Sequence, residues 1–351
     1  NGIDPLEIID KYGADALRLT IVTGNAAGND MRFYEERVEA NRNFANKVWN
    51  ASRFIMMNME GRQITEPKAE DFAPEDKWVL SKINTLIKDV TENMDKFELG
   101  IAVQKVYDFI WNEFCDWYIE MTKYRTYHAE ENPVSANAAL WTLKTVLGDA
   151  LKLLHPYMPF VTEEIYSALV PEEESLMMSS WPVYKEEWNF AAEEEIVERM
   201  KEVIRGVRNV RAEMNVAPSR KAKVFVVSEK EEICSGFELL KLSAAPLMSA
   251  SEIIIQDHKD GIGEDAVSVV VTDAVCYLPL EDLVDFAQEI ERLEKEEARL
   301  VKELARVNGM LSNEKFISKA PEAKINEEKA KLEKYTQMME QVKERLEALR
   351  K

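Results

Sequence analysis

Residues 283–351 carry two stretches of heptad-spaced apolar side chains, and this spacing constrains the fold more than any other feature of the chain. The first stretch follows steps of three and four residues, at Leu283, Phe286, Ile290 and Leu293 and then, after Glu297, at Leu300, Leu304, Val307 and Leu311. The second runs through Leu332, Tyr335, Met339, Val342, Leu346 and Leu349. Such spacing is typical of helices that pair along a narrow apolar seam.

The segment from Ser312 to Glu322 interrupts the seam, and Pro321 stands where a second helix would open. The pattern therefore predicts an antiparallel coiled-coil hairpin. Each side of about 28 residues, rising about 1.5 Å per residue, would project roughly 40 Å, which suits a reach toward a large partner. A dimerising coiled coil, and hence a protein-interaction module, is the alternative that the periodicity leaves open. The hairpin predicts a monomer.

Composition sets the broad class. With 351 residues, 46% of them hydrophobic, the chain is long enough for two or three domains with apolar cores. The three cysteines, Cys115, Cys234 and Cys276, lie far apart, which favours a reducing compartment and gives no zinc motif. The first residues lack a signal-peptide pattern, and no apolar run is long enough to span a membrane. We therefore expect a cytoplasmic protein without a membrane partner.

The distribution of charge is uneven. A net charge of -20 argues against general adhesion to nucleic acid, because affinity for phosphate comes from Lys and Arg. Residues 199–223, however, hold eight basic residues against two acidic ones, and residues 283–351 are neutral with fifteen of each sign. A polyanion would thus be attracted at chosen places and repelled elsewhere, which favours one docking pose.

Helical periodicity dominates the first two thirds of the chain. It predicts helices over 32–59, 75–94, 99–127, 135–155, 160–169 and 193–213. Short β-branched runs then predict strands over 222–228, 252–256, 267–271 and 275–279, with a helix over 229–241 between the first two. The predicted fold is mainly α: a helical bundle, a small α+β junction domain and the coiled-coil hairpin.

Polar residues form two adjoining stripes on the helix predicted over 32–59. Arg42, Asn46 and Arg53 make one stripe, and Asn43, Lys47 and Asn50 make the other. Amides and cationic groups of this kind can contact base edges and phosphates. An ordinary solvated helix face explains the same pattern equally well.

Catalytic signatures are absent from the sequence. It contains no Gly-rich phosphate loop, no His-Glu-x-x-His motif, no cysteine-pair zinc pattern and only three histidines, so we predict no catalytic and no metal-binding residue. Glu113, Asp116 and Glu120 could form an acid pair, although a solvated helix flank is favoured. The aromatic residues of 107–124 could stack unpaired bases, but most of them recur at helical spacing, which favours a core role.

Several segments resemble the C-terminal half of the valyl-tRNA synthetase family, of class I aminoacyl-tRNA synthetases. Residues 1–18 resemble the segment that follows that family's Lys-Met-Ser-Lys-Ser loop. The motifs at 43–53, 108–120 and 154–164 are similar to the helical anticodon-binding domain that the valyl, isoleucyl and leucyl enzymes share. The motifs at 208–218 and 313–321 resemble the valyl enzyme, whereas isoleucyl enzymes commonly end in a zinc module. An isoleucyl enzyme is the alternative within the class.

The resemblance implies four segments: 1–35 after the catalytic core, an anticodon-binding bundle over 36–188, a junction domain over 189–281 and a tRNA-binding arm over 282–351. It implies tRNA(Val) and the enzyme's own N-terminal catalytic domain as partners. ATP and magnesium would serve the full-length enzyme, with no cofactor in this part and no aminoacylation by it alone. The implied anticodon contacts are Arg42, Asn43, Asn46, Lys47, Asn50 and Arg53. The implied backbone and elbow contacts are Arg205, Arg208, Arg211, Arg299, Lys302, Arg306, Lys315 and Lys319.

Overall fold

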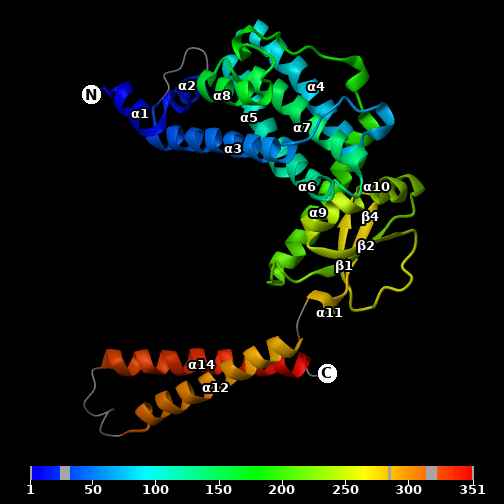
Figure 1. Ribbon diagram of the computed structural model, residues 1–351. Helices are drawn as coiled ribbons and strands as arrows, with labels where there is room; N and C mark the ends of the chain where they lie inside the picture. Colours follow the sequence, from blue (N-terminus) through cyan, green and yellow to red (C-terminus); the bar gives the residue numbers. More distant parts are fainter. Residues whose placement is uncertain (1, 24–31, 284–285, 314–321, 350–351) are drawn as a thin grey trace. The chain divides into compact units, whose positions relative to one another are not determined.

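The computed structural model describes residues 2–23, 32–283, 286–313 and 322–349 (Figure 1). Its contacts divide the chain into two compact units. The first, here called the body, comprises Asn1–Val210, Lys223–Ile262 and Ser268–Tyr277, and the second comprises Arg211–Ala222, Gly263–Val267 and Leu278–Lys351. Helices make up most of both units, which confirms the predicted mainly α fold. The finer division into four segments stays a prediction.

Two short helices begin the body. The side chain of Asp4 accepts a hydrogen bond from the Leu6 amide and so caps α1 (Pro5–Tyr12), whose first residue is proline. Gly13 has a φ of 88°, a positive value that glycine adopts readily, and this lets the chain turn directly into α2 (Ala14–Val22). Buried residues of both helices pack against Val38 of α3 (Glu35–Met59). The N-terminal segment is thus built onto the long helix.

The second helix is also tied to the bundle by polar contacts. The carboxylate of Asp15, which is 8% exposed, accepts hydrogen bonds from the amides of Phe160 and Val161, at 3.3 and 2.7 Å. These amides belong to the first turn of α8 (Pro159–Leu169), where a helix leaves its N–H groups without intrahelical partners. Arg18 donates to the carbonyl of Pro156, at 3.0 Å. Residues 14–18 are therefore anchored to the bundle as well as to α3.

The remaining bundle helices lie within a few residues of their predicted ranges. They are α4 (Pro74–Asp95), α5 (Leu99–Asp108), α6 (Ile119–Tyr127) and α7 (Pro133–Leu154), with short 3₁₀ turns η1 (Ala69–Asp71), η3 (Leu176–Met178) and η4 (Glu186–Trp188). Asn132 caps α7 by accepting from the Ser135 amide, with Pro133 in the first turn. Trp78, Phe44 and Leu143 are examples of fully buried core residues. His155 follows α7, and its Nδ1 lies 2.8 Å from the Thr162 hydroxyl, consistent with a structural role.

The helix predicted over 99–127 is continuous but not uniform. Between α5 and α6 the chain forms a π-helix, η2 (Phe109–Tyr118), and such wide turns are rare in proteins. Phe109, Phe114, Trp117 and Tyr118 are buried in it. The core interpretation of these four aromatic side chains is therefore confirmed. Apolar spacing alone did not reveal the change of helix type.

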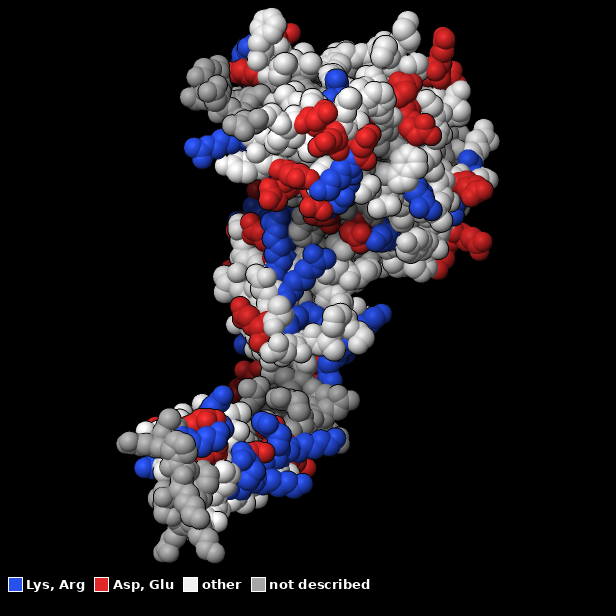
Figure 2. Space-filling view, turned by 90° about the vertical axis from the view of Figure 1, so that its left-hand side faces the viewer, with Lys and Arg blue, Asp and Glu red and all other residues white. Residues whose placement is uncertain are grey.

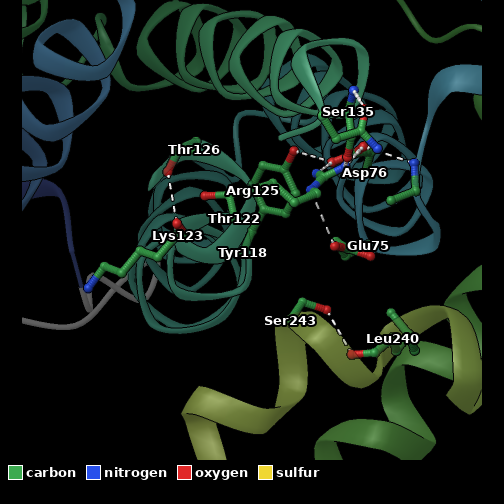
Figure 3. A network of polar contacts seen from close by, with 12 residues as sticks. Glu75, Asp76, Tyr118, Thr122, Lys123, Arg125, Thr126, Ser135, Leu240 and Ser243 are labelled. Atoms are coloured by element: carbon green, nitrogen blue, oxygen red, sulfur yellow. Dashed lines mark hydrogen bonds and ion pairs between the residues drawn. The ribbon is translucent and has the colours of Figure 1, made fainter. Parts of the chain in front are cut away.

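A buried charged cluster, shown in Figure 3, joins three of these helices. Arg125 of α6 makes an ion pair with Asp76 of α4, donating Nη1 to one carboxylate oxygen at 2.8 Å and Nη2 to the other. The Tyr118 hydroxyl donates to the same carboxylate at 2.7 Å. Glu75 lies on the side that faces Ser243, with a carboxylate oxygen 3.6 Å from Arg125 Nε. Burial raises the pKa of both Glu75 and Tyr118.

The α+β part follows α9 (Ala191–Glu213). It contains β1 (Ala222–Val227), α10 (Glu231–Met248), β2 (Ala250–Gln256), β3 (Val267–Val271) and β4 (Ala274–Leu278), which confirms the predicted order of elements. The sheet order is β2-β1-β4-β3. β1 and β4 are antiparallel with Phe225 opposite Tyr277, whereas β1 and β2 are neighbours joined through α10. Gly206 of α9 leaves room for Val269, because a Cβ there would lie 2.6 Å from that side chain.

The second unit contains the arm, formed by α12 (Phe286–Leu311) and α14 (Glu322–Leu349) after the short α11 (Leu280–Leu283). The two long helices pack side by side and run in opposite directions (Figure 1). Leu293, Leu300 and Val307 are buried on one helix, and Met339 and Leu346 on the other. The described residues thus form the intramolecular hairpin that the heptads predicted. The connection over 314–321 lies outside them.

Candidate nucleic-acid interface

The six predicted anticodon contacts all lie on α3, and most of them face solvent. The opposite face of the helix carries its buried residues: Val38, Phe44, Val48, Ser52 and Ile55. Asn43, Asn46, Asn50 and Arg53 are exposed, whereas Arg42 and Lys47 are half-buried. Within the described part of the chain, Asn46, Asn50 and Arg53 have no hydrogen-bond or ion-pair partner. The surface formed by all six residues is here called the α3 stripe. Its members Asn46, Asn50 and Arg53 offer amide and guanidinium groups that the fold does not use.

Arg42 is partly held by its own surroundings. Its Nη2 donates to Glu39 and to the side-chain oxygen of Asn43, each at 3.1 Å, and the guanidinium lies 5.5 Å from the centre of the Tyr12 ring. Its Nε is buried without a partner among the described residues. Arg42 is therefore fixed in direction at one end of the stripe.

Lys47 has the most elaborate environment. Its ammonium lies 2.6 Å from the Asp116 carboxylate of η2 and 3.9 Å from the centre of the Trp111 ring. Trp111 stacks on Tyr107 at 5.8 Å, and Tyr107 stacks on Phe44 at 4.2 Å between ring centres. The lysine thus caps a column of aromatic rings that links α3 to the π-helix. Sequence reasoning assigned Asp116 to a solvated flank and did not pair it with Lys47.

The stripe continues past its last predicted residue. Met57, one helical turn beyond Arg53, is 68% exposed and was not predicted from the sequence. It lines a shallow groove of about 380 Å³ whose walls are Met56, Met57, Met59, Glu60, Ala168 and Leu169. The repeat Asn46, Asn50, Arg53, Met57 follows helical spacing, and this signal could have revealed the extension.

The other two acidic residues proposed as an acid pair are held separately. Glu113 accepts from Lys201 at 2.7 Å, and Glu120 accepts from Lys123 at 2.6 Å. Each carboxylate therefore has its own cation, and the arrangement is structural. Lys201 is 1% exposed and lies over the rings of Trp78 and Trp117, which fixes α9 to the bundle.

Two predicted backbone contacts on α9 are exposed and stack on a tryptophan. The guanidinium groups of Arg205 and Arg208 lie 5.1 and 5.7 Å from the Trp117 ring centre. Arg208 also donates Nε to the Leu247 carbonyl at 2.7 Å, and burial lowers the pKa of its guanidinium. Figure 2 shows Lys and Arg gathered along the face of the body near α9, while Asp and Glu gather over the helical part. This face is suited to meeting phosphates.

Arg211 is placed differently from its two neighbours. It is 6% exposed, and its Nη2 donates to the carbonyls of Ala217 and Arg220, at 3.2 and 2.6 Å. Burial lowers the pKa of Arg211. The side chain holds the turn that follows α9, so its geometry favours a structural role over the phosphate contact expected from the sequence.

Three of the predicted arm contacts lie on one face of α12, at spacings of three and four residues. Arg299 Nε donates to Glu296 at 2.9 Å, and Arg306 Nε donates to Glu303 at 3.0 Å. Lys302 between them is exposed, without a partner among the described residues. Figure 2 shows a group of basic side chains on one face of the arm. Lys315 and Lys319 lie outside the described residues.

Over the described residues, no group of three or more His, Cys, Asp or Glu side chains is arranged to hold a metal ion. Within the same residues, no helix combines the length and the apolar character required to span a membrane.

Two family models match the chain. Residues 76–226 match the anticodon-binding domain of tRNA ligase, and residues 285–350 match the valyl tRNA synthetase tRNA binding arm. The first range contains α9 and the second contains positions 299–319 of the arm, so all the predicted backbone contacts lie within the two matches. The α3 stripe precedes the first match.

Curated relatives extend the match over nearly the whole chain. The valine-tRNA ligase of Clostridium perfringens is 53% identical over 99% of this chain, and that of Clostridium tetani is 51% identical over 100%. The chain spans 39% of the length of each of these two relatives. The valine-tRNA ligase of Clostridium acetobutylicum is 48% identical over 100% of this chain and 40% of its own length. The chain therefore belongs to the valine-tRNA ligase family, of which it carries the part formed by the anticodon-binding domain and the tRNA-binding arm.

Proposed function

We propose that this chain is the tRNA-positioning part of a valine-tRNA ligase. The proposed partner is tRNA(Val), with the α3 stripe at the anticodon and with α9 and the arm on the RNA backbone and elbow. The observation that carries the proposal is the row of unpartnered amide and guanidinium groups on α3, in a chain of this family. Groups that the fold does not use are available to base edges and phosphates.

The physical logic is alignment of a long substrate. Several separate contacts along one tRNA fix its angle more firmly than a single contact does, because each later contact forms at high effective concentration. Correct orientation of the reacting end then lowers the barrier of the reaction. We propose that the catalytic part of the enzyme, with ATP and magnesium, carries out aminoacylation, and that this chain alone does not.

The family match favours the valyl over the isoleucyl alternative, because the relatives named above are valine-tRNA ligases. The two helices of the hairpin pack against each other along their apolar seam, which supports a monomer near 40.4 kDa over a dimerising coil. The proposed compartment is the cytoplasm, because Cys115, Cys234 and Cys276 are free thiols. Light scattering of the purified chain tests the oligomeric state directly.

Fluorescence anisotropy with tRNA(Val) and an anticodon-swapped version, at two salt concentrations, tests the function. We expect tighter, salt-sensitive binding of tRNA(Val). Asn46→Ala and Asn50→Ala together should reduce the preference between the two RNAs, because both amides lie on the α3 stripe. Lys96→Ala, an exposed change at the end of α4, is the control and should leave that preference intact. Equal binding of the two RNAs by the parent chain would contradict the anticodon-reading role.

The arm has its own test. Replacing Arg299, Lys302 and Arg306 by Ala should weaken binding of both RNAs alike and reduce the salt dependence, because phosphate contacts carry no sequence information. The ratio of the two affinities should stay unchanged. Unaltered binding across a salt titration would remove the arm from the interface.

A further inference from the structure

Lys47 differs from the rest of the α3 stripe in having an anion from another element as its partner. Its ammonium pairs with Asp116 of η2 at 2.6 Å, whereas Arg42 is held by Glu39 of its own helix. Asn46, Asn50 and Arg53 have no such partner among the described residues. Lys47 is therefore already paired with a carboxylate from outside α3 before any RNA arrives.

The pair lies at the surface and can exchange. The side chain of Lys47 is 25% exposed and that of Asp116 is 49% exposed. Ion pairs at this level of exposure contribute little to stability, because water and salt screen them. An RNA phosphate has the same sign as the carboxylate and also accepts charge-assisted hydrogen bonds from an ammonium. It can therefore take the place of the carboxylate without any loss of a strong internal contact.

The Trp111 ring holds the Lys47 ammonium in place during such an exchange. The ring centre lies 3.9 Å from Lys47 Nζ, and this attraction does not depend on which anion is present. Trp111 is itself fixed by stacking on Tyr107 and by its nearly parallel approach to Phe44, at 6.3 Å and 19°. The cation thus has a rigid seat and an exchangeable counter-charge.

We propose that an RNA phosphate displaces the Asp116 carboxylate from Lys47 when the chain binds tRNA, so that Asp116 acts as a built-in competitor. The inference rests on the proposed function and adds a phosphate-binding site and a residue that sets its threshold. Every RNA must displace the same carboxylate. RNAs that make few other contacts then fall below the affinity needed for binding.

A mutant cycle on the full chain tests the exchange, read by anisotropy with tRNA(Val) at low and moderate salt. Asp116→Asn should tighten binding about two- to fivefold, the range that a surface ion pair is worth. It should also steepen the salt dependence by up to about one phosphate contact, because Lys47 is then free to release a counterion. Lys47→Met should abolish both effects in the double variant. Circular dichroism checks that each variant is folded.

Asp108→Asn is the matched control, because it removes the same charge from an exposed position near η2 whose carboxylate accepts from Gln104 and not from Lys47. It should leave affinity unchanged. A gain from Asp108→Asn, or a gain from Asp116→Asn that persists without Lys47, would assign the effect to net charge and overturn the exchange. Weaker binding by Asp116→Asn would also overturn the exchange, because Asp116 would then be a positioning residue for Lys47.

The outcomes also separate this inference from the proposed function. If the parent prefers tRNA(Val) over the anticodon-swapped RNA but Asp116→Asn binds as the parent does, the exchange fails and the function stands. If the cycle gives the expected gain but the two RNAs bind alike, the phosphate site stands and anticodon reading fails. If no variant binds either RNA, both fail.

Discussion

One buried glutamate of the body and one of the arm are paired with cations in different ways, the first across helices and the second within its own helix. Glu75 of α4 and Glu328 of α14 are each 2% exposed, and in each the Oε2 atom is buried without a partner among the described residues. Glu75 faces Arg125, which comes from a different helix 50 positions along the chain. Glu328 pairs with Lys331 at 2.9 Å and lies 3.9 Å from Lys324, both on its own helix.

The contrast extends to the other ion pairs of the two regions. In the body, Arg125 with Asp76 and Lys201 with Glu113 connect separate helices, and in both pairs the side chain of the cation is at most 10% exposed. In the arm, Arg299 with Glu296 and Arg306 with Glu303 are neighbours on one helix and are exposed. Buried ion pairs therefore connect helices of the body in addition to its apolar core, whereas the hairpin packs through its apolar seam and keeps these two ion pairs at the surface.

The largest expected effect breaks the charged cluster of the body. Arg125→Met leaves Asp76, which is fully buried, without its cation, and removing one partner of a buried pair typically costs about 3–5 kcal/mol. Urea denaturation followed by tryptophan fluorescence measures this loss, because all seven tryptophans lie between residues 49 and 188. Arg306→Met in the arm is the control and should leave that transition in place. A loss below about 1 kcal/mol for Arg125→Met would show that the cluster is not structural.

The seam of the arm comes next. Leu300 is fully buried on α12, and Leu→Ala at such a site costs about 2–5 kcal/mol, here at the lower end because a two-helix hairpin can collapse around the gap. Hydrogen exchange of the arm amides should speed up, with the tryptophan transition of the body unchanged. Val301→Ala, at a neighbouring position that is 53% exposed, should change little. If Leu300→Ala lowered the stability of the body as much as that of the arm, the two regions would not be stabilised independently.

A smaller effect should depend on pH and reverse the usual sign for a carboxylate. Burial, the leading cause, raises the pKa of Glu75 above its ordinary 4.5. At low pH both states are protonated, and as pH rises through 4.5 the unfolded chain ionises first, so this group costs stability from there upward. Glu75→Gln should therefore stabilise the body at pH 7, by about 1 kcal/mol as for relief of a buried unsatisfied group. Denaturation at pH 7 and pH 4 should show the gain shrinking at the lower pH.

The smallest effect concerns Glu327, the exposed neighbour of Glu328. Hydrogen bonds from Lys324 and Lys331 lower its pKa from 4.5 to about 2. Its contribution is therefore complete above pH 4.5 and is lost as pH falls toward 2, the opposite of Glu75. In the full chain, Glu327→Gln should reduce the change in hydrogen exchange of the arm amides that acid causes in the parent. High salt should weaken the effect in the parent.

The local sequence pattern was enough to predict most of the helices and strands. The heptads of 283–351 predicted the paired helices, and β-branched runs predicted the strands near their observed bounds, because these periodicities are set by the geometry of each element. The same counting of apolar positions missed Glu328, which stands seven residues before Tyr335 and so occupies a seam position. It also missed the π-helix at 109–118, whose apolar spacing resembles that of an α-helix.

The site was predicted only in part. The α3 stripe was visible as polar residues at helical spacing, and its exposure agrees with that pattern. Which members are free was not visible. Asp116 lies 69 positions from Lys47, and the carbonyls that hold Arg211 come from a turn that forms only when the chain folds.

Sequence alone thus determined which segments are helical, where the seam of the arm runs and which family the motifs resemble, since these depend on spacing along the chain. Tertiary structure decided which charges are buried, paired or available to RNA. The reason is that an ion pair forms between groups that are close in space, and packing brings Lys47 to Asp116 and Arg125 to Asp76 from distant parts of the sequence.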